Sequence, residues 1–234
     1  MMEILDTGIS SANDNMRFDE KLLENLSPND EPLLHLYHWE RPSATYGYFI
    51  RPGNHLNFER ATYHNLDLAQ RPTGGGIVFH IWDLAFSFLM PAKHPAFSLN
   101  TLENYEFVNN AVLETVYSYF SLVPELIEEE VPSLTSDCRN FCMAKPTQYD
   151  VVYKGMKIAG AAQRRRKQGY LHQGTISLVK PKTSMLEEVL LSKEVLKAMT
   201  SYTFAPIINP KDLGKVRNDL QKLLAEKLKD ALKF

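Results

Sequence analysis

A run of three glycines is the first feature of the sequence that points to ligand binding. Residues 71–80 read Arg-Pro-Thr-Gly-Gly-Gly-Ile-Val-Phe-His, so Gly74, Gly75 and Gly76 stand directly before an apolar run. Glycines let a ligand approach the backbone, and their N–H groups can face an anion. The block matches neither a phosphate-binding loop that ends in Lys-Ser/Thr nor the G-x-G-x-x-G dinucleotide pattern. A tight turn between two strands is the alternative that this motif alone leaves open.

A single lysine beside small residues is the second candidate. Residues 149–160 read YDVVYKGMKIAG, a pattern typical of a β-hairpin with its turn at Lys154 and Gly155. Lys157 lies on the second arm, close to Gly160 and three alanines. A lysine in such a place is usually exposed to solvent. Small neighbours, however, leave room for a ligand whose phosphate or carboxylate charge the ammonium would neutralise.

Three further motifs carry weaker signals. Residues 171–175 (LHQGT) form an expected strand in which Gly174 hints at close backbone approach. The basic run 164–167 is more typical of a solvated loop than of a nucleic-acid site. Cys138 and Cys142 have no second Cys/His pair nearby, so no metal site is assigned.

Composition limits the possible classes of protein. The 234 residues contain 26 Lys and Arg against 28 Asp and Glu, and this balance opposes broad nucleic-acid binding. Two cysteines are too few for a disulfide scaffold, and the N-terminal residues do not resemble a secretory signal. The most apolar stretch is interrupted by His80 and Asp83 and is too short to span a bilayer. We therefore expect a cytoplasmic protein with neither nucleic acid nor membrane as partner.

Hydrophobic periodicity predicts the elements that must position these residues. Strands and helices occur without strict βαβ alternation, which favours an α+β fold with a mixed or antiparallel sheet flanked by helices. We expect a single domain over 1–234, with a helical C-terminal tail over about 184–234. Helices are predicted at 13–26, 101–120 (capped by Asn100), 184–199 and 211–232, and strands at 33–39, 43–50, within 76–90 with a bend near Asp83, at 149–160 and at 171–179.

Taken together, three blocks resemble the lipoate–protein ligase/octanoyltransferase family. They are RPTGGGIVFHIWDLAFSF, YDVVYKGMKIAGAAQRRRKQG and LHQGTISL, and PSATYGYF at 42–49 resembles an earlier strand motif of the same family. The resemblance implies the biotin/lipoate protein ligase catalytic fold. Few residues follow the third block, so it also implies a catalytic domain without the full accessory domain of two-domain ligases.

The resemblance also implies roles for individual residues. Thr73 and the glycines after it would wrap the acyl tail and phosphate of an acyl-adenylate, with Arg71 beside the phosphate. Lys157 matches the recurrent lysine of the family, which is expected to contact the acyl carbonyl or the phosphate. The other positions that match substrate- or nucleotide-binding motifs are His80, Asp83, Asp150, Gly160, His172 and Gly174.

Two mechanisms remain open within the family. A ligase activates lipoate or octanoate with ATP and Mg²⁺, and the acceptor lysine attacks the acyl-adenylate. A transferase takes the acyl group from acyl-carrier protein or another lipoylated domain onto a thiol first. Cys142 stands eight residues before Asp150, as the transferase cysteine often does, so the resemblance makes it a candidate nucleophile. The alternative is that Cys142 is a small buried apolar side chain. Gly76, however, occupies a position where such transferases tend to have arginine, so the sequence favours the ligase slightly.

The same resemblance names the partners. The acceptors would be lipoyl domains of 2-oxoacid dehydrogenase acyltransferase subunits or the glycine-cleavage H protein. Three other interpretations compete with this one: an inactive homologue that only binds lipoyl domains, a biotin ligase, and a nucleic-acid binder that uses residues 164–167. The lysine hairpin and the H-x-x-D-L block, which contains His80 and Asp83, look more like the lipoate branch than the biotin branch, and the net charge opposes the last interpretation.

Overall fold

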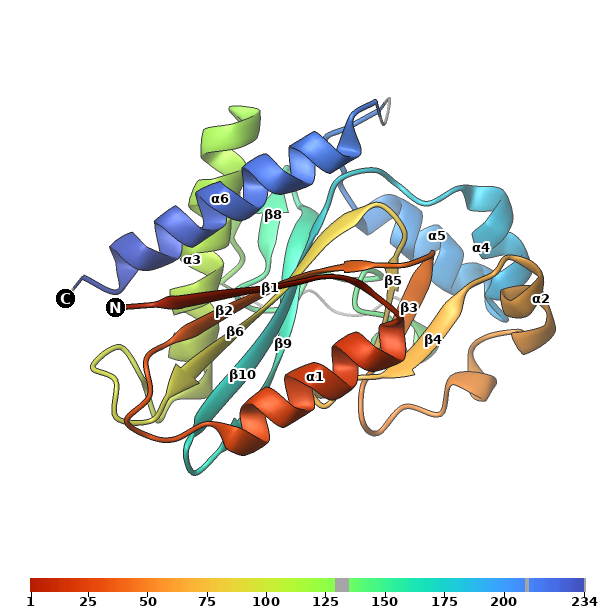
Figure 1. Cartoon of the computed structure of the whole chain (residues 1–234). Coiled ribbons are helices and arrows are strands. Elements are labelled where there is room, and N and C mark those ends of the chain that lie inside the picture. Colours follow the sequence, from red (N-terminus) through yellow and green to blue (C-terminus); the bar gives the residue numbers. More distant parts are fainter. Residues whose placement is uncertain (129–134, 209–210, 234) are drawn as a thin grey trace.

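The computed structural model describes residues 1–128, 135–208 and 211–233, which form an α+β fold built on a mixed sheet. The described strands form a seven-stranded sheet in the order β1-β2-β6-β10-β9-β8-β7 and a second sheet in the order β4-β3-β5. Helices flank the larger sheet (Figure 1), which confirms the predicted fold class. The strands are β1 (Glu3–Ser10), β2 (Leu33–Trp39), β3 (Ser43–Tyr46), β4 (Asp67–Gln70), β5 (Ile77–His80), β6 (Asp83–Pro91), β7 (Glu125–Leu126), β8 (Val151–Tyr153), β9 (Met156–Arg166) and β10 (Gly169–Ser177). The helices are α1 (Ala12–Asn25), α2 (Phe58–Tyr63), α3 (Thr101–Phe120), α4 (Thr183–Val189), α5 (Lys193–Tyr202) and α6 (Leu213–Ala231), with 3-10 turns at Pro52–Asn54 and Asp137–Asn140.

The two faces of the larger sheet have different partners. Side chains alternate across a strand, so Leu34 and Leu36 of β2 pack into the main core with α3 and α6. Tyr37 lies on the opposite face and packs with Met16 of α1, and Trp39 packs against the same cluster. Strand β2 therefore has one aliphatic face for the core and one aromatic face turned toward α1.

The second sheet holds the segment that carries Cys142. Phe79 of β5 packs in one cluster with Phe141 and with Val195 of α5. The backbone N–H of Cys142 donates to the carbonyl of Ile77 at 3.1 Å, which extends the β5 pairing into this segment. The thiol is thus placed by a strand on one side and by a helix on the other.

The structure differs from the predicted elements in places where tertiary contacts override local pattern. Strands β1 and β4 and helix α2 were not predicted; β1 is a largely exposed edge strand that pairs with β2 in parallel. The predicted strand 43–50 ends at Tyr46, because the chain then turns, with the N–H of Ile50 donating to the carbonyl of Gly47 at 2.9 Å. The predicted helix 184–199 is divided, since Leu190 leaves the helix to form a bridge with Leu56.

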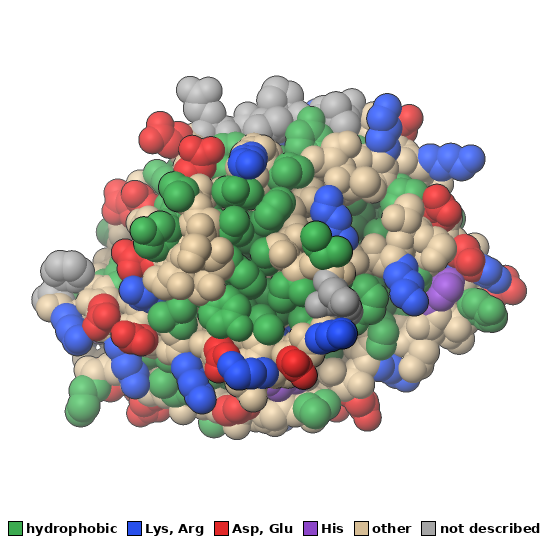
Figure 2. Space-filling model, turned by 90° about the horizontal axis from the view of Figure 1, so that it is seen from above, with side chains coloured by type: hydrophobic (Ala, Val, Ile, Leu, Met, Phe, Trp, Pro, Cys, Tyr) green, Lys and Arg blue, Asp and Glu red, His purple; other side chains and the backbone are tan. Residues whose placement is uncertain are grey.

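The surface carries both signs of charge. On the face seen in Figure 2, acidic and basic side chains of the described residues are interspersed around apolar groups. None of the described helices combines the length and the apolar character that crossing a membrane requires.

Candidate active site

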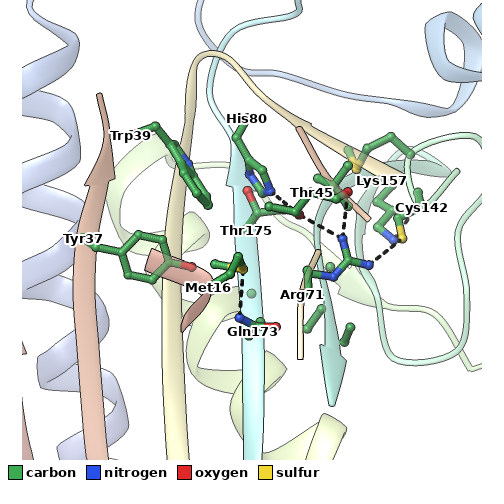
Figure 3. Close-up of a pocket in the computed structure, with 16 residues that line it drawn as sticks. Met16, Tyr37, Trp39, Thr45, Arg71, His80, Cys142, Lys157, Gln173 and Thr175 are labelled. Carbon is green, nitrogen blue, oxygen red and sulfur yellow. Dashed lines mark hydrogen bonds between the residues drawn. The ribbon is translucent and has the colours of Figure 1, made fainter. Parts of the chain in front are cut away.

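Two cavities meet at Cys142. The first is a slot of about 450 Å³, its open mouth included. The second is a wider groove of about 740 Å³. Cys142, Lys157, Ala161 and Ala162 line both. Tyr37 and Trp39 lie at one end of the slot, and Cys142 and Lys157 lie at the other (Figure 3).

The thiol of Cys142 faces two donors. Its Sγ accepts a hydrogen bond from the backbone N–H of Gly76 at 3.2 Å and lies 4.0 Å from Nη2 of Arg71. The side chain is half-buried rather than packed away in the core. Of the two interpretations left open by the sequence, the accessible thiol fits this environment better than the small apolar residue.

Arg71 is a buried cation that pairs with no carboxylate within the described part of the chain. The residue is 5% exposed, and its guanidinium donates to the carbonyls of Gly74 and Gly76 and to Oγ1 of Thr45. Buried charges are ordinarily paired, because an uncompensated charge is costly to remove from water. The sulfur of Cys142 lies 4.0 Å from Nη2 of Arg71.

Lys157 forms a buried ion pair. Its Nζ lies 2.7 Å from Oδ2 of Asp150, and both side chains are almost fully buried. The same Nζ donates to the backbone carbonyl of Cys142 at 3.0 Å. A Cβ at Gly160 would lie 2.2 Å from Cε of Lys157, so glycine is needed there for the pair to form. The lysine therefore fixes the backbone of Cys142, and the residue lines both cavities.

Residues at the end of α5 also hold Lys157 and the Cys142 segment in place. The N–H of Phe204, just after α5, donates to the carbonyl of Lys157 at 2.8 Å. Thr203 donates its hydroxyl to the carbonyl of Met143 at 3.1 Å. The end of α5 thereby connects β9 with the segment that carries Cys142.

A chain of hydrogen bonds runs from Asp83 to Arg71. Asp83 lies 2.6 Å from Nδ1 of His80, and Nε2 of His80 lies 2.9 Å from Oγ1 of Thr45, which accepts from Arg71. Burial opposes ionisation of Asp83, but the charge and hydrogen bond of His80 hold its pKa below the usual value. His80 also stacks on Trp39, with 4.4 Å between ring centroids. His80 and Asp83 thus orient the guanidinium, and His80 itself lines the slot.

The glycine block is shaped by contacts with its neighbours. Gly75 has φ +84°, a backbone conformation that favours glycine. At Gly76 a Cβ would lie 2.4 Å from the carbonyl oxygen of Asn140. Thr73 donates its hydroxyl to Oε1 of Gln173 at 2.7 Å, which fastens the block to β10. Gly76 thus permits the close approach of the Cys142 segment.

Two of the predicted binding residues lie differently from the rest. His172 is fully buried against Phe86 and Tyr105, outside the residues that line the slot and the groove. Burial lowers its pKa to about 3, so it is neutral near pH 7. Gly174 lines the slot, but a Cβ there would lie 2.4 Å from the ring of Phe86, so packing already requires glycine at this position.

The structure brings most of the predicted residues together. Arg71, His80, Cys142, Lys157, Gly160 and Gly174 line the slot, and Gly74, Gly75 and Gly76 line the groove with Cys142 and Lys157. Thr73, Asp83 and Asp150 act on these residues through hydrogen bonds or an ion pair. Sequence reasoning missed Met16, Tyr37, Trp39, Thr45, Gln173 and Thr175, which also line the slot. The alternation of Tyr37 and Trp39 with leucines was the one signal that could have indicated a second, non-core face of β2.

Comparison with known proteins establishes the family. The family described as "Lipoyl protein ligase A/B catalytic domain" matches residues 11–233, nearly the whole chain. This chain belongs to that family. The resemblance of the three sequence blocks is thereby confirmed, and the protein is an enzyme of the lipoate ligase/octanoyltransferase group.

Among the relatives are proteins named octanoyltransferase LipM. The one from Geobacillus kaustophilus is 34% identical over 194 residues, which cover 80% of this chain and 67% of that protein. The one from Bacillus subtilis is 32% identical over 180 residues, which cover 74% of this chain and 64% of that protein. The chain thus spans about two thirds of the length of these relatives.

Solved structures share the fold. Lipoate-protein ligase A bound with ATP superposes with a TM-score of 0.73 at 21% identity, covering 99% of this chain and 84% of that one. A bi-partite lipoate protein ligase from Thermoplasma acidophilum, described with its E2 lipoyl domain, gives the same score, identity and coverage. At this identity the comparison supports the fold alone.

Proposed function

We propose that this protein is an octanoyl/lipoyl transferase that carries the acyl group as a thioester on Cys142. The observation that carries the proposal is the position of the Cys142 thiol, which lies where the slot meets the groove. The thiol faces Arg71, which pairs with no carboxylate of the described residues. Relatives above 30% identity that are named octanoyltransferases support the same choice. The described chain acts in this proposal as one catalytic domain.

The first step is acyl transfer to the enzyme. The thiolate of Cys142 attacks the carbonyl carbon of an octanoyl thioester on acyl-carrier protein, and a new S–C bond forms. The carrier's S–C bond breaks, and its sulfur leaves as a thiolate that takes up a proton. Arg71 stabilises the attacking thiolate, and the Gly76 N–H orients the sulfur. Lys157, at the same junction, is the cation available to the negative charge that develops on the carbonyl oxygen.

The second step passes the acyl group to a lysine. The unprotonated ε-amine of a lysine in a lipoyl domain or glycine-cleavage H protein attacks the Cys142 thioester. An amide C–N bond forms, the S–C bond breaks, and the proton of the amine ends on the released thiol or in solvent. The groove provides the approach for both the carrier arm and the acceptor lysine, because it opens directly on Cys142.

The ligase interpretation has less support. The sequence favoured the ligase because a glycine stands at position 76. The close approach of the Asn140 backbone also accounts for a glycine at this position. ATP and Mg²⁺ have no part in the proposed reaction. Both cysteines are free thiols in the structure, which suits a reducing, cytoplasmic location.

An acylation assay tests the proposal. Apo-lipoyl domain is incubated with octanoyl-carrier protein and the enzyme, with and without ATP, and the acceptor is weighed. We expect equal acylation in both conditions and almost none with Cys142→Ser, because a serine hydroxyl is hardly ionised near neutrality. Cys138→Ala, which changes the other free cysteine, is the matched control and should retain transfer. Dependence on ATP, or full activity of Cys142→Ser, would refute the transferase.

A further inference from the structure

We infer that the turn at residues 47–50 is the surface on which the acceptor domain docks, with Tyr48 and Phe49 as its apolar contacts. Phe49 is 88% exposed and Tyr48 is 53% exposed, and the two rings meet edge-on with 5.2 Å between their centroids. The inference deepens the proposed function by locating its partner. It rests on that function only for the requirement that a lysine of a folded domain reaches Cys142.

The backbone of the turn is held in place on both sides. The N–H of Ile50 donates to the carbonyl of Gly47 at 2.9 Å, and the N–H of Tyr48 donates to the carbonyl of Thr73 at 3.1 Å. The side-chain amide of Gln70 donates to the carbonyl of Tyr48 at 3.0 Å. Exposed aromatic rings on a fixed backbone lose little conformational entropy when a partner covers them, so they are suited to binding.

The turn borders the groove that leads to the thiol. Gly47 packs so closely on the carbonyl oxygen of Gly75 that a Cβ at position 47 would overlap it, and Gly75 lines the groove. A Cβ at Gly75 would itself lie 3.5 Å from Sγ of Cys142. The Cα of Phe49 is two residues from that of Gly47, at most about 7.6 Å away. A single glycine therefore separates the turn from the reacting sulfur.

The short reach of a lysine brings the acceptor onto this turn. A lysine side chain extends only about 6 Å from Cα to Nζ, so the backbone of the acceptor has to come to the mouth of the groove when the amine attacks Cys142. A folded domain of about 100 residues has a radius of gyration of about 13 Å, so it covers the exposed surface around that mouth. The acyl group of a carrier protein sits on a long flexible arm, which lets the carrier stay farther away. The turn is therefore assigned to the acceptor and not to the carrier.

The charges beside the turn indicate the chemistry of the partner. Arg51 follows the turn and is exposed, and the guanidinium of Arg164 lies 5.7 Å from the centre of the Tyr48 ring. The acceptor should therefore present apolar and acidic groups beside its lysine. Arg164 lies 3.7 Å from Glu20, which balances part of its charge, so Arg51 is the clearer probe.

The area of the two rings fits a brief encounter. An aromatic side chain offers at most about 250 Å². Tyr48 and Phe49 together therefore fall short of the ~800 Å² per partner that a stable interface buries. A substrate domain that binds, reacts and leaves needs no more than this, whereas a permanent dimer of the chain does.

Binding of the acceptor tests the docking surface without any transfer. Apo-lipoyl domain is titrated with the Cys142→Ala protein, and its dissociation constant is measured by NMR. Adding Phe49→Ser should weaken binding about tenfold, a loss typical of a central aromatic contact, and Phe49→Tyr in its place should restore most of the affinity. Arg51→Glu should weaken binding at low salt, and this effect should fade at about 0.5 M salt. Tyr117→Ser, which changes an exposed aromatic residue of α3, is the matched control and should bind like the parent protein.

Transfer kinetics separate docking from chemistry. Phe49→Ser should raise KM for the lipoyl domain about tenfold and change kcat little, because the ring contacts the acceptor equally before and during the reaction. If Cys142 never becomes acylated but Phe49→Ser still weakens binding of the lipoyl domain, the transferase is wrong and the docking surface is supported. Equal binding of the lipoyl domain with and without Phe49→Ser would overturn the inference. A loss of binding to the carrier alone, or a change of oligomeric state in Phe49→Ser, would overturn it as well, because another partner would then cover the turn.

Discussion

At the scale of single residues, the site depends on how four charged or ionisable side chains are paired. Lys157 is neutralised by Asp150, whereas Arg71 has no described carboxylate and faces the Cys142 sulfur. Lys157 therefore holds the backbone of Cys142 in place, and Arg71 is the cation that faces its sulfur. The sequence predicted that Lys157 and Arg71 belong to the site. It could not show which of them has a partner, because Asp150 is seven residues from Lys157 and meets it only through the hairpin.

Substitution of Lys157 should affect stability as well as activity. Lys157→Met leaves the Asp150 carboxylate buried without its partner, and breaking such a pair costs about 3–5 kcal/mol. The double variant Lys157→Met/Asp150→Asn removes both charges and should recover most of this loss. Transfer should stay reduced by roughly 10²-fold or more in both variants, since neither has a cation at the carbonyl.

Urea unfolding and acyl-transfer rates, measured on the same preparations, check this prediction. Full transfer by the double variant would show that Lys157 is only a structural member of the ion pair. Equal stability of the single variant and the wild type would mean that the pair is not buried in solution.

At the scale of elements, the glycine block and the segment 137–142 are placed against each other. The N–H of Gly76 donates to the thiol of Cys142, and the missing side chain of Gly76 leaves room for the backbone of Asn140. One residue therefore determines both the hydrogen bond to the thiol and the distance between the two segments. Helix 101–120 was predicted with the bounds that the structure has, because its periodicity and its Asn100 cap are local signals. The approach of Asn140 to Gly76 is a contact between segments 64 residues apart, which no local pattern reveals.

Gly76→Ala should displace the thiol while leaving the sheet intact. The new methyl group would clash with the Asn140 backbone, and a shift of about 1 Å at a reacting group can reduce the rate about 10²-fold. Gly214→Ala is the matched control, because a Cβ there meets no atom within 4 Å and the residue lies in α6. Rates of adduct formation are compared with circular dichroism spectra. If Gly76→Ala and Gly214→Ala transfer the acyl group equally fast, the close contact between the glycine block and the segment 137–142 does not position the thiol.

At the scale of the whole molecule, the sheet separates a catalytic face from a core face. The strand β10 shows this division: Gln173 faces the slot, whereas His172 lies buried on the other side with Phe86. The motif LHQGT led us to place His172 in the site. Adjacent residues of a strand point to opposite faces, and the sequence motif did not show which face the ligand occupies.

The neutral state of His172 should make stability depend on pH. Burial lowers its pKa from the usual 6.5 to about 3 in the folded protein, whereas the unfolded chain takes up the proton below about 6.5. The unfolded state thus binds more protons between these values, so the free energy of unfolding falls as pH decreases from 6.5 toward 3, by up to ~1.4 kcal/mol per pH unit. Urea denaturation between pH 7 and 4.5 should show a steeper loss for the wild type than for His172→Gln. Parallel curves for the two proteins would contradict the assignment of His172 as a buried neutral side chain.

The chemistry of Cys142 is the central claim, and the mass of the enzyme itself tests it most directly. The protein is mixed with octanoyl-carrier protein without ATP, quenched, and measured intact and after peptide mapping. We predict a gain of one octanoyl group on the peptide that contains Cys142, removed by hydroxylamine and lost in Cys142→Ala. An enzyme that octanoylates a lipoyl domain while its own mass never changes, or one that does so only with ATP, would contradict the thioester mechanism.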